Sequence, residues 1–496
     1  MGPTLDYLAL APELALAVTV MAVLTADIVL PHAQKYWTAV LSVLGLTVTA
    51  LPIAFLLVSD DGSRSMLDGS YVVDDFSLIL KGLFVIAGYI VVLMSVSYIE
   101  SDRYYQGEYY FLLLASILGS VVMASARDLI LLFVGLELVS GPLFLLAGWR
   151  KGDVKSNEAS LKFYLLGVLS AAILLYGMSF LYGLTGSVDF DGIRQASVGM
   201  SETPAFIMAI LFIMVGFAFK ISAVPFHFWA PDTYEGAPTP VTAYMSVSSK
   251  AAGFVGMLIV TYVAFPGASN IWGPALWIMA ALTMTLGNLT ALRQTNIVRL
   301  LAYSSIAQAG FMLVPFAVAG VSSDPRAISA AFSATVTYIA IYTFMNLGAF
   351  AVVIAGARYT RSGDINRWAG LGTYQPGIAL FGLIFFLSLA GIPPLAGWYA
   401  KLVMFSAAIG GGSIWTAVLA AIAALNAVVA FYYYARVVKA MWFDPVPEGF
   451  VPGDPPQSRS LQLAMVIAGV FVIVAGIYPP ISAYFGDTVA SIITGG

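Results

Sequence analysis

Cysteine is absent from this chain, and histidine occurs only twice, as His32 and His227, among 496 residues. A chain without cysteine forms no disulfide and supplies no thiolate to a metal or an iron–sulfur cluster, and two histidines are too few for most haem sites. A P-loop pattern is also absent, which argues against ATP hydrolysis. We therefore expect no cofactor in this chain, and any redox chemistry connected with it belongs to other chains.

Charged residues are scarce as well. They make up 10% of the chain, against roughly 25% in soluble domains. Hydrophobic residues make up 60%, and the mean hydropathy is +0.91. Net charge is −4 and the basic residues form no block, so nucleic acid is not an expected partner. The composition predicts an all-α integral membrane protein, with a first span that is retained because no basic segment precedes it.

The apolar windows give the number of spans. A helix needs about 20 apolar residues to cross a bilayer. We predict about 14 transmembrane helices, with approximate bounds 8–29, 37–58, 75–98, 108–125, 128–148, 158–183, 204–229, 240–264, 273–292, 297–319, 327–356, 376–408, 413–438 and 460–482. No soluble domain is expected, because the longest hydrophilic stretch, 444–460, is rich in proline and typical of a loop.

The basic residues predict the orientation. Cytoplasmic loops are usually the ones rich in Lys and Arg. With the N-terminus outside, the inner loops hold Lys35, Arg103, Arg150, Lys151, Lys155, Arg293, Arg299, Arg358, Arg361, Arg367, Arg436, Lys439 and Arg459, whereas the outer loops hold Arg64, Arg127, Arg194 and Arg326. We therefore expect both termini on the outer side. The five remaining basic residues lie within spans: Lys81, Lys162, Lys220, Lys250 and Lys401.

Two spans share a Pro-x-x-x-Trp spacing. Pro225 and Trp229 lie in span 7, and Pro394 and Trp398 lie 169 residues later in span 12. This spacing predicts two inverted five-helix repeats, spans 4–8 and 9–13, with broken helices 7 and 12, although a chance match is the alternative. The expected division is 1–107, an N-terminal three-span segment; 108–264, the first repeat; 273–438, the second; and 439–496, an inner loop and the last span.

Charged groups inside the membrane are the candidate functional residues, because their burial is costly unless they face a partner, a cavity or water. Glu137 lies nine residues after Asp128, roughly 14 Å along a helix. We expect it to pair with Lys220, either as part of a proton-transfer route or as a static ion pair. Lys250 and Lys401 extend these two residues into a row through the membrane, and buried amines of this kind can exchange protons near ambient pH.

Four further charged positions lie outside this row, and two of them, Lys162 and His227, allow two interpretations each. Lys162 serves either in conduction or in a local ion pair with Glu158, four residues earlier. His227, beside the break, either passes protons or ties freed backbone groups. Lys81 is expected to extend its amine to the outer surface, and Glu13 is expected to contact a neighbouring subunit or the interface.

Three segments carry a family resemblance: FKISAVPFHFWAPDTYEGAPTPVTAYMSVSSK at 219–250, RLLAYSSIAQAGFML at 299–313 and FFLSLAGIPPLAGWYAKL at 385–402. With them, essentially the whole chain resembles the antiporter-like subunits of proton-pumping NADH-quinone oxidoreductase, respiratory complex I. The resemblance implies that Glu137 pairs with Lys220, that Lys250 is the central relay and that Lys401 is the exit-side group. It supports roles for Lys162 and His227 less securely.

The resemblance also implies the setting of the protein. NADH, FMN, iron–sulfur clusters and quinone are expected in partner subunits, and the expected neighbours are the antiporter-like subunit M and the small subunits K and J. The expected location is the bacterial inner membrane. Two alternatives remain at this point: a subunit of a multisubunit sodium/proton antiporter, which has the same motifs, or a mainly structural scaffold.

Overall fold

Apolar helices dominate the computed structural model, which describes residues 5–59, 62–101 and 107–494. Twelve helices of these ranges are long and apolar enough to cross a membrane, and α8 and α16 are shorter apolar helices. The only strands among the described residues form one short hairpin, β1 paired antiparallel with β2. The predicted class, an all-α multi-span membrane protein, is confirmed. Arg103, counted above with the basic loops, lies outside the described residues.

Most elements follow one another with short connections, and the exception is the 443–458 loop between α18 and α19. Their bounds are α1 Ala11–Val29, α2 Tyr36–Ser59, β1 Arg64–Met66, β2 Tyr71–Val73, α3 Asp75–Ser101, α4 Gly107–Ala124, α5 Leu129–Ala147, α6 Val154–Thr185, α7 Phe190–Ala196, α8 Pro204–Lys220, α9 Trp229–Gly236, α10 Thr239–Tyr244, α11 Lys250–Ile259, α12 Ser269–Ala291, α13 Ile297–Val321, α14 Pro325–Thr360, α15 Leu371–Tyr374, α16 Pro376–Ala390, α17 Gly397–Gly410, α18 Ile414–Trp442, α19 Arg459–Ile477 and α20 Pro480–Thr494.

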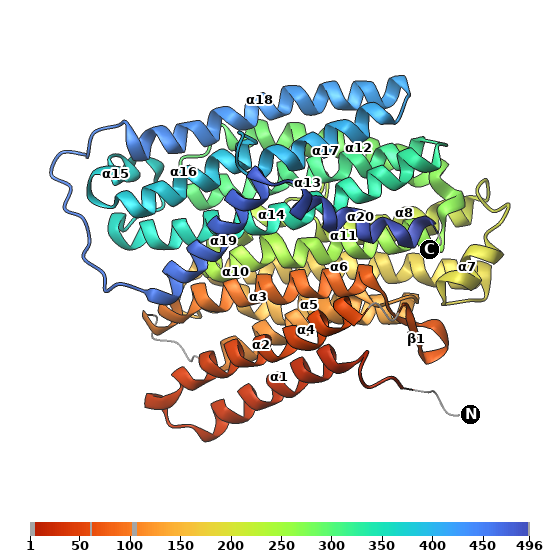
Figure 1. Cartoon of the computed structure of the whole chain (residues 1–496), viewed down its shortest axis with the longest axis horizontal. Coiled ribbons are helices and arrows are strands. Elements are labelled where there is room, and N and C mark those ends of the chain that lie inside the picture. Colours follow the sequence, from red (N-terminus) through yellow and green to blue (C-terminus); the bar gives the residue numbers. More distant parts are fainter. Residues whose placement is uncertain (1–4, 60–61, 102–106, 495–496) are drawn as a thin grey trace.

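The long helices run side by side, with α1 and α2 at one edge of the bundle and α18 at the other (Figure 1). We call the end of the bundle with the 443–458 loop, at the left of Figure 1, the basic side, and the opposite end, with α7 and the β1–β2 hairpin, the acidic side. The bundle is buried at its centre: α13 and α14 are almost wholly covered, whereas α1, α2 and α18 expose large apolar side chains. Such exposed surfaces suit contact with lipid or with neighbouring subunits.

Both predicted breaks are present. Span 7 stops at Lys220 and resumes as α9 at Trp229, and span 12 stops at Ala390 and resumes as α17 at Gly397. Proline and the left-handed Gly391, at φ 89°, end the helical pattern there. Neighbouring groups satisfy part of the freed backbone. In the first break these bonds are Val224 N to Thr283 Oγ1 at 2.9 Å and Trp229 Nε1 to Phe219 O at 3.0 Å, and in the second Gly397 N to Ser388 Oγ at 3.1 Å.

Three features were not expected. The span 239–264 is not uniform, because π-helical turns occupy Met245–Ser249 and Val260–Ala264. The β1–β2 hairpin and α7 give the acidic side some structure of its own. The chain also continues beyond span 14, since α20 follows α19 after Pro479 and runs on from it toward the acidic side (Figure 1).

Candidate functional site

Lys220 and Glu137 lie close together but are not directly paired. The Lys220 side chain is buried, and its ammonium donates to the hydroxyl of Ser140, one helical turn beyond Glu137 on α5. No ion pair within 4.0 Å joins Glu137 to Lys220, and Glu137 Oε1 is buried without a hydrogen-bond partner. Glu137, three residues before Ser140, lies on the same face of α5 as that hydroxyl. The ammonium therefore has two partners within reach on one helix face, a hydroxyl that it contacts and a carboxylate that it does not.

The helix that bears Lys250 packs directly against the Lys220 break. A Cβ added to Gly253 would lie 2.9 Å from Lys220 Cβ, so only glycine allows this close approach. Lys250 precedes Gly253 by three residues and therefore lies on the same face of α11, about 5 Å away along the axis. The Lys250 side chain is buried, and its ammonium donates to Ser305 O at 2.8 Å and Ser305 Oγ at 2.6 Å.

Lys250 begins α11 directly after a π-helical turn, Met245–Ser249. Such turns are rare and often occur at functional sites, because the extra residue shifts the side chains that follow around the helix. No ion pair of 4.0 Å or less involves Lys250 among the ranges given above, so its amine is held by oxygen atoms of α13 rather than by a carboxylate.

Neutral polar groups continue from Lys250 toward Lys401. Ser304, the neighbour of Ser305, bonds to Tyr434 OH at 2.5 Å. Gln308 Nε2 donates to Tyr434 OH at 3.3 Å and to Leu389 O at 3.2 Å, and Gln308 Oε1 accepts from Tyr338 OH at 2.7 Å. Gln308 therefore connects α13 with α14, α16 and α18 in the buried centre of the bundle.

The connection ends at Lys401, just beyond the second break. Its ammonium donates to Ala390 O, the carbonyl next to Leu389, and lies 5.5 Å from the centre of the Phe311 ring. Ala390 is the last residue of α16, so its carbonyl belongs to the negative end of the helix dipole. The Lys401 side chain covers Gly391 so closely that an added Cβ would lie 2.6 Å from Lys401 Cδ. The missing side chain of Gly391, in the second break, therefore leaves the space that the Lys401 side chain occupies.

His227 and Lys162 occupy different surroundings from this row. His227 is buried between α8 and α9, its ring 4.4 Å from that of Phe228, and its Nδ1 has no hydrogen-bond partner. Lys162 is 41% exposed and pairs with Glu158 at 2.6 Å and with Asp232 at 2.7 Å. The local pair expected for Lys162 is thus present, and its second partner lies on α9.

An ion cluster on the basic side ties α9 to its neighbours. Arg299 of α13 contacts Asp232 at 3.0 Å and Glu235 at 2.8 Å, and Lys155 contacts Glu235 at 3.3 Å. Partial burial acts to raise the pKa of Asp232 and of Glu235, but the hydrogen bonds from these cations outweigh it and hold the pKa of each carboxyl below its ordinary value. Asp232 and Glu235 therefore serve as ion-pair partners for basic residues of α6 and α13.

The cluster predicts a pH-dependent effect of Arg299→Gln on stability. A carboxyl whose pKa is lowered by folding stabilises the fold above its ordinary pKa of about 4, and this contribution is lost as the pH falls through the lowered value. We expect Arg299→Gln to lower the thermal unfolding midpoint at pH 7, and we expect the difference from the unsubstituted chain to close below about pH 4. An equal difference in unfolding midpoint at every pH would contradict the ion pairing of Arg299 with Asp232 and Glu235.

The expectation for Lys81 was wrong. Its side chain is fully buried and does not extend to the surface; the ammonium lies 2.8 Å from Glu13 Oε1 and 3.4 Å from Tyr71 OH. The β1–β2 hairpin, which contributes Tyr71, was not foreseen. Glu13 therefore contacts α3 of the same chain, and its own side chain is 11% exposed.

Removing one partner of this pair should destabilise the chain more than removing both. Lys81→Met leaves the Glu13 carboxylate buried without a countercharge, which typically costs about 3–5 kcal/mol. We expect Lys81→Met to lower the unfolding midpoint of the purified protein in detergent, and Lys81→Met with Glu13→Leu to recover most of the loss. Lys155→Met is the control, since that side chain is 73% exposed. A double variant no more stable than the single one would contradict a buried ion pair.

Sequence reasoning identified the charged members of the row and missed the neutral ones. Ser140, Ser305, Gln308 and Tyr434 are common residue types in membrane helices, and only their buried position in apolar spans was available as a signal. Within 5–59, 62–101 and 107–494, no group of three or more Asp, Glu or His side chains could hold a metal ion.

Comparison with known proteins decides the family. Residues 126–426, more than half of the chain, match the profile described as NADH:quinone oxidoreductase/Mrp antiporter, TM. A protein of Trichlorobacter lovleyi named NADH-quinone oxidoreductase subunit N is 40% identical over 494 residues, covering 99% of this chain and 98% of that protein. The chain belongs to this family, in its subunit N group. The resemblance drawn from the three sequence segments is confirmed.

Solved structures agree with this membership. A chain of the Thermus thermophilus structure described as respiratory complex I with bound aureothin is 32% identical, with a TM-score of 0.77, covering 97% of this chain and 99% of that one. A chain of the Mrp complex from a Dietzia species is 20% identical, with a TM-score of 0.85 and 98% coverage of both chains. At that lower identity, the likeness shows that this chain and the chain of the Mrp complex share a fold, and no more.

Proposed function

We propose that this chain is the proton-translocating membrane-arm subunit of an NADH-quinone oxidoreductase. Its buried row, Glu137, Lys220, Lys250 and Lys401, carries protons that are driven by quinone reduction in other subunits. The observation that carries the proposal is the placement of the three amines inside the bundle, each bonded to a hydroxyl or a carbonyl rather than facing lipid. NADH, FMN, the iron–sulfur clusters and quinone belong to the partner chains, with subunits M, K and J as neighbours.

The first step would be a change of partner at Lys220. The ammonium rests on Ser140 while the Glu137 carboxylate stays close, so a small movement along α5 changes the charge coupling between them. Pairing with Glu137 stabilises the charged amine, whereas release from it favours loss of the proton because the site is buried.

The later steps would use the connection through α13. Lys250 can pass a proton to the Ser305 hydroxyl if that hydroxyl releases its own proton in the same step, since a hydroxyl both donates and accepts a hydrogen bond. Ser304 and Tyr434 offer further hydroxyls and Gln308 orients Tyr434, while water would have to carry the proton from these hydroxyls to the Lys401 amine beside Ala390 O. His227 and Lys162 have lesser roles, His227 as a proton acceptor beside the break and Lys162 in the basic-side ion cluster.

The orientation and the internal repeats belong to the same proposal. The basic side faces the cytoplasm of a bacterial cell, and both termini lie outside. Residues 108–264 and 273–438 act as two inverted halves, between an N-terminal segment, 1–107, and a final segment, 439–496. What supports this division is the pair of breaks at corresponding spans, each with a lysine in or near the break.

Purification from native membranes tests the function. We expect the tagged chain to copurify with flavin and iron–sulfur clusters, detected by absorbance and electron paramagnetic resonance, together with NADH:quinone activity. Copurification with membrane subunits that carry neither group, together with sodium/proton exchange in vesicles, would support the antiporter alternative instead. A mainly structural role would be supported if Glu137→Gln and Lys250→Met left pumping intact in the assembled enzyme.

A further inference from the structure

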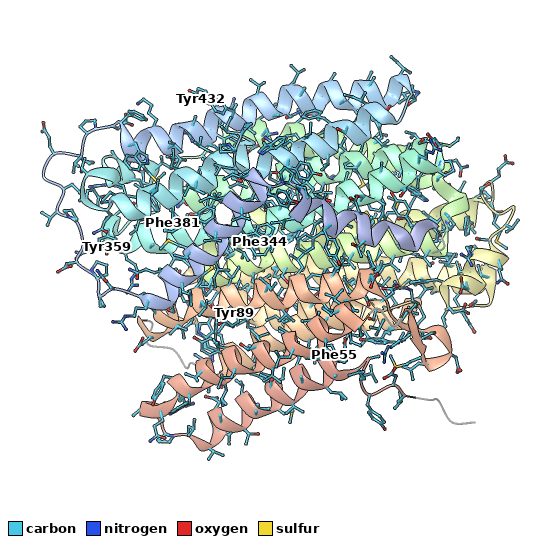
Figure 2. The ribbon with its side chains drawn as sticks, in the orientation of Figure 1. Phe55, Tyr89, Phe344, Tyr359, Phe381 and Tyr432 are labelled. Carbon is cyan, nitrogen blue, oxygen red and sulfur yellow. The ribbon has the colours of Figure 1, made fainter. Side chains whose placement is uncertain are left out.

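An amphipathic cavity of about 340 Å³ opens near the basic side, outside the buried row. Its walls come from the end of α14, the segment 375–381 and the start of α19 with the preceding loop. The part toward the basic side is polar, with Arg358, Gln375, Gln457 and Gln462, whereas Phe381 and other apolar residues line the rest. Figure 2 shows Tyr359 at the end of α14 and Phe381 further along the bundle, near α19.

The loop before α19 is fastened over the end of α14 and so forms a fixed wall. Gly453 N donates to Tyr359 O at 2.8 Å, and a Cβ added to Gly453 would lie 2.7 Å from Arg358 O. The cavity is therefore built by defined contacts. The proline-rich segment, expected only as a loop, has a structural task here.

The charge of the cavity favours an anion. Arg358 lines it and no carboxylate does; Asp454 lies on the same loop, is exposed and is not part of the lining. The cavity near the acidic side, between α14, α17 and α20, differs in this respect because both Arg326 and Asp487 line it. Arg358 donates to Ser97 Oγ at 3.5 Å and has no carboxylate partner within 4.0 Å among the described residues. An arginine of this kind with neighbouring amide donors suits a phosphate group, which accepts several hydrogen bonds.

An apolar surface continues from the cavity along α19. Val466 lines the cavity, and Val470, Ile473 and Ile477 follow at spacings of four, three and four residues, which places all four side chains on one helix face. They are 43%, 54%, 36% and 66% exposed. From Val466 to Ile477 the helix rises by roughly 16 Å, and half of the hydrocarbon core of a bilayer is about 15 Å. The surface is as long as one leaflet is deep.

From these observations we infer that the cavity and the α19 surface bind one anionic phospholipid of the basic-side leaflet. The phosphate lies by Arg358 and the glutamine amides, and an acyl chain lies along Val466, Val470, Ile473 and Ile477. A polar anionic head and an apolar tail of one-leaflet length are the two parts that this surface accommodates. The inference is independent of the proton route and concerns how the chain is held in the membrane.

Two substitutions test the two halves of the site, and each has a matched control. Arg358→Gln removes the cation, with Arg326→Gln as its control in the other cavity. Gly377→Leu fills the cavity, since Gly377 has no atom within 4 Å of an added Cβ; Gly410→Leu, in the other cavity and equally unobstructed, is its control. The assembled enzyme is purified in mild detergent, and the retained phospholipids are extracted and identified by mass spectrometry.

We expect Arg358→Gln and Gly377→Leu each to lose about one anionic phospholipid per chain, and the two controls to retain it. Delipidated enzyme should regain that lipid from phosphatidylcholine vesicles that contain phosphatidylglycerol, and inorganic phosphate alone should not compete. Equal lipid content in all four variants would overturn the inference. So would loss of a neutral lipid only, or unchanged lipid with loss of a neighbouring subunit in Gly377→Leu, which would identify a protein occupant.

Discussion

Lys250→Met in the assembled enzyme is expected to lower proton pumping by at least about tenfold, the rate change that corresponds to 1.4 kcal/mol. Methionine has nearly the length of lysine and fills the same buried space, but it cannot take up a proton. The amine lies between the Lys220 break and the oxygens of Ser305, so its loss interrupts the proposed route at its centre. Pumping is measured in reconstituted vesicles by quenching of a pH-sensitive dye.

A control variant and the cofactor content show whether a loss of pumping comes from the missing amine or from failed assembly of the enzyme. Lys155→Met removes an exposed lysine of the basic side and should leave pumping unchanged. Flavin and iron–sulfur content should stay at the level of the unsubstituted enzyme in both variants. Full pumping by Lys250→Met, in enzyme with normal cofactor content, would remove Lys250 from the route.

Lys220→Met is expected to have the second large effect, at least about a tenfold loss of pumping-linked turnover. The substitution removes the buried amine that the proposal couples to the Glu137 carboxylate. Ser140→Ala is the matched variant, because it removes the resting partner of the ammonium but keeps the amine and the carboxylate. We expect Ser140→Ala to retain most of the turnover.

The comparison of these two variants decides whether the Ser140 hydroxyl or the Glu137 carboxylate is the essential partner of the Lys220 amine. If Ser140→Ala loses as much turnover as Lys220→Met, the hydroxyl and not the carboxylate is the essential partner of the amine. If Lys220→Met turns over and pumps normally, the charge coupling proposed at the first break is wrong. Turnover is followed as NADH oxidation, with and without an uncoupler.

Hydropathy and charge predicted the spans and the buried lysines of this protein, because few backbone and side-chain arrangements are stable inside a bilayer. Backbone groups inside it must be satisfied within helices, so apolar length alone indicates the spans. A charged side chain must leave the lipid, so Lys220, Lys250 and Lys401 were expected inside the bundle, and they are there. The two breaks followed from proline and glycine in otherwise apolar segments.

The rest depends on contacts that no local pattern shows. Whether Lys81 meets water or Glu13 depends on how α1 and the β1–β2 hairpin pack on α3, and the reach of a lysine side chain allows either. That Lys220 contacts Ser140 and not Glu137 depends on how the end of α8 lies beside α5. Gln308 and Tyr434 are distant in sequence, and only the packing of α13 against α18 brings them together.

One double-variant measurement tests whether the buried amines form a single route. Pumping is compared among Lys250→Met, Lys401→Met and the variant with both substitutions, at equal cofactor content in the same vesicles. The effects of substituting groups that act in one sequence are strongly non-additive, so a connected row predicts that the double variant pumps as well as the poorer single variant. Losses that multiply in the double variant would show that the two amines work independently, and would contradict a connected row from Lys250 to Lys401.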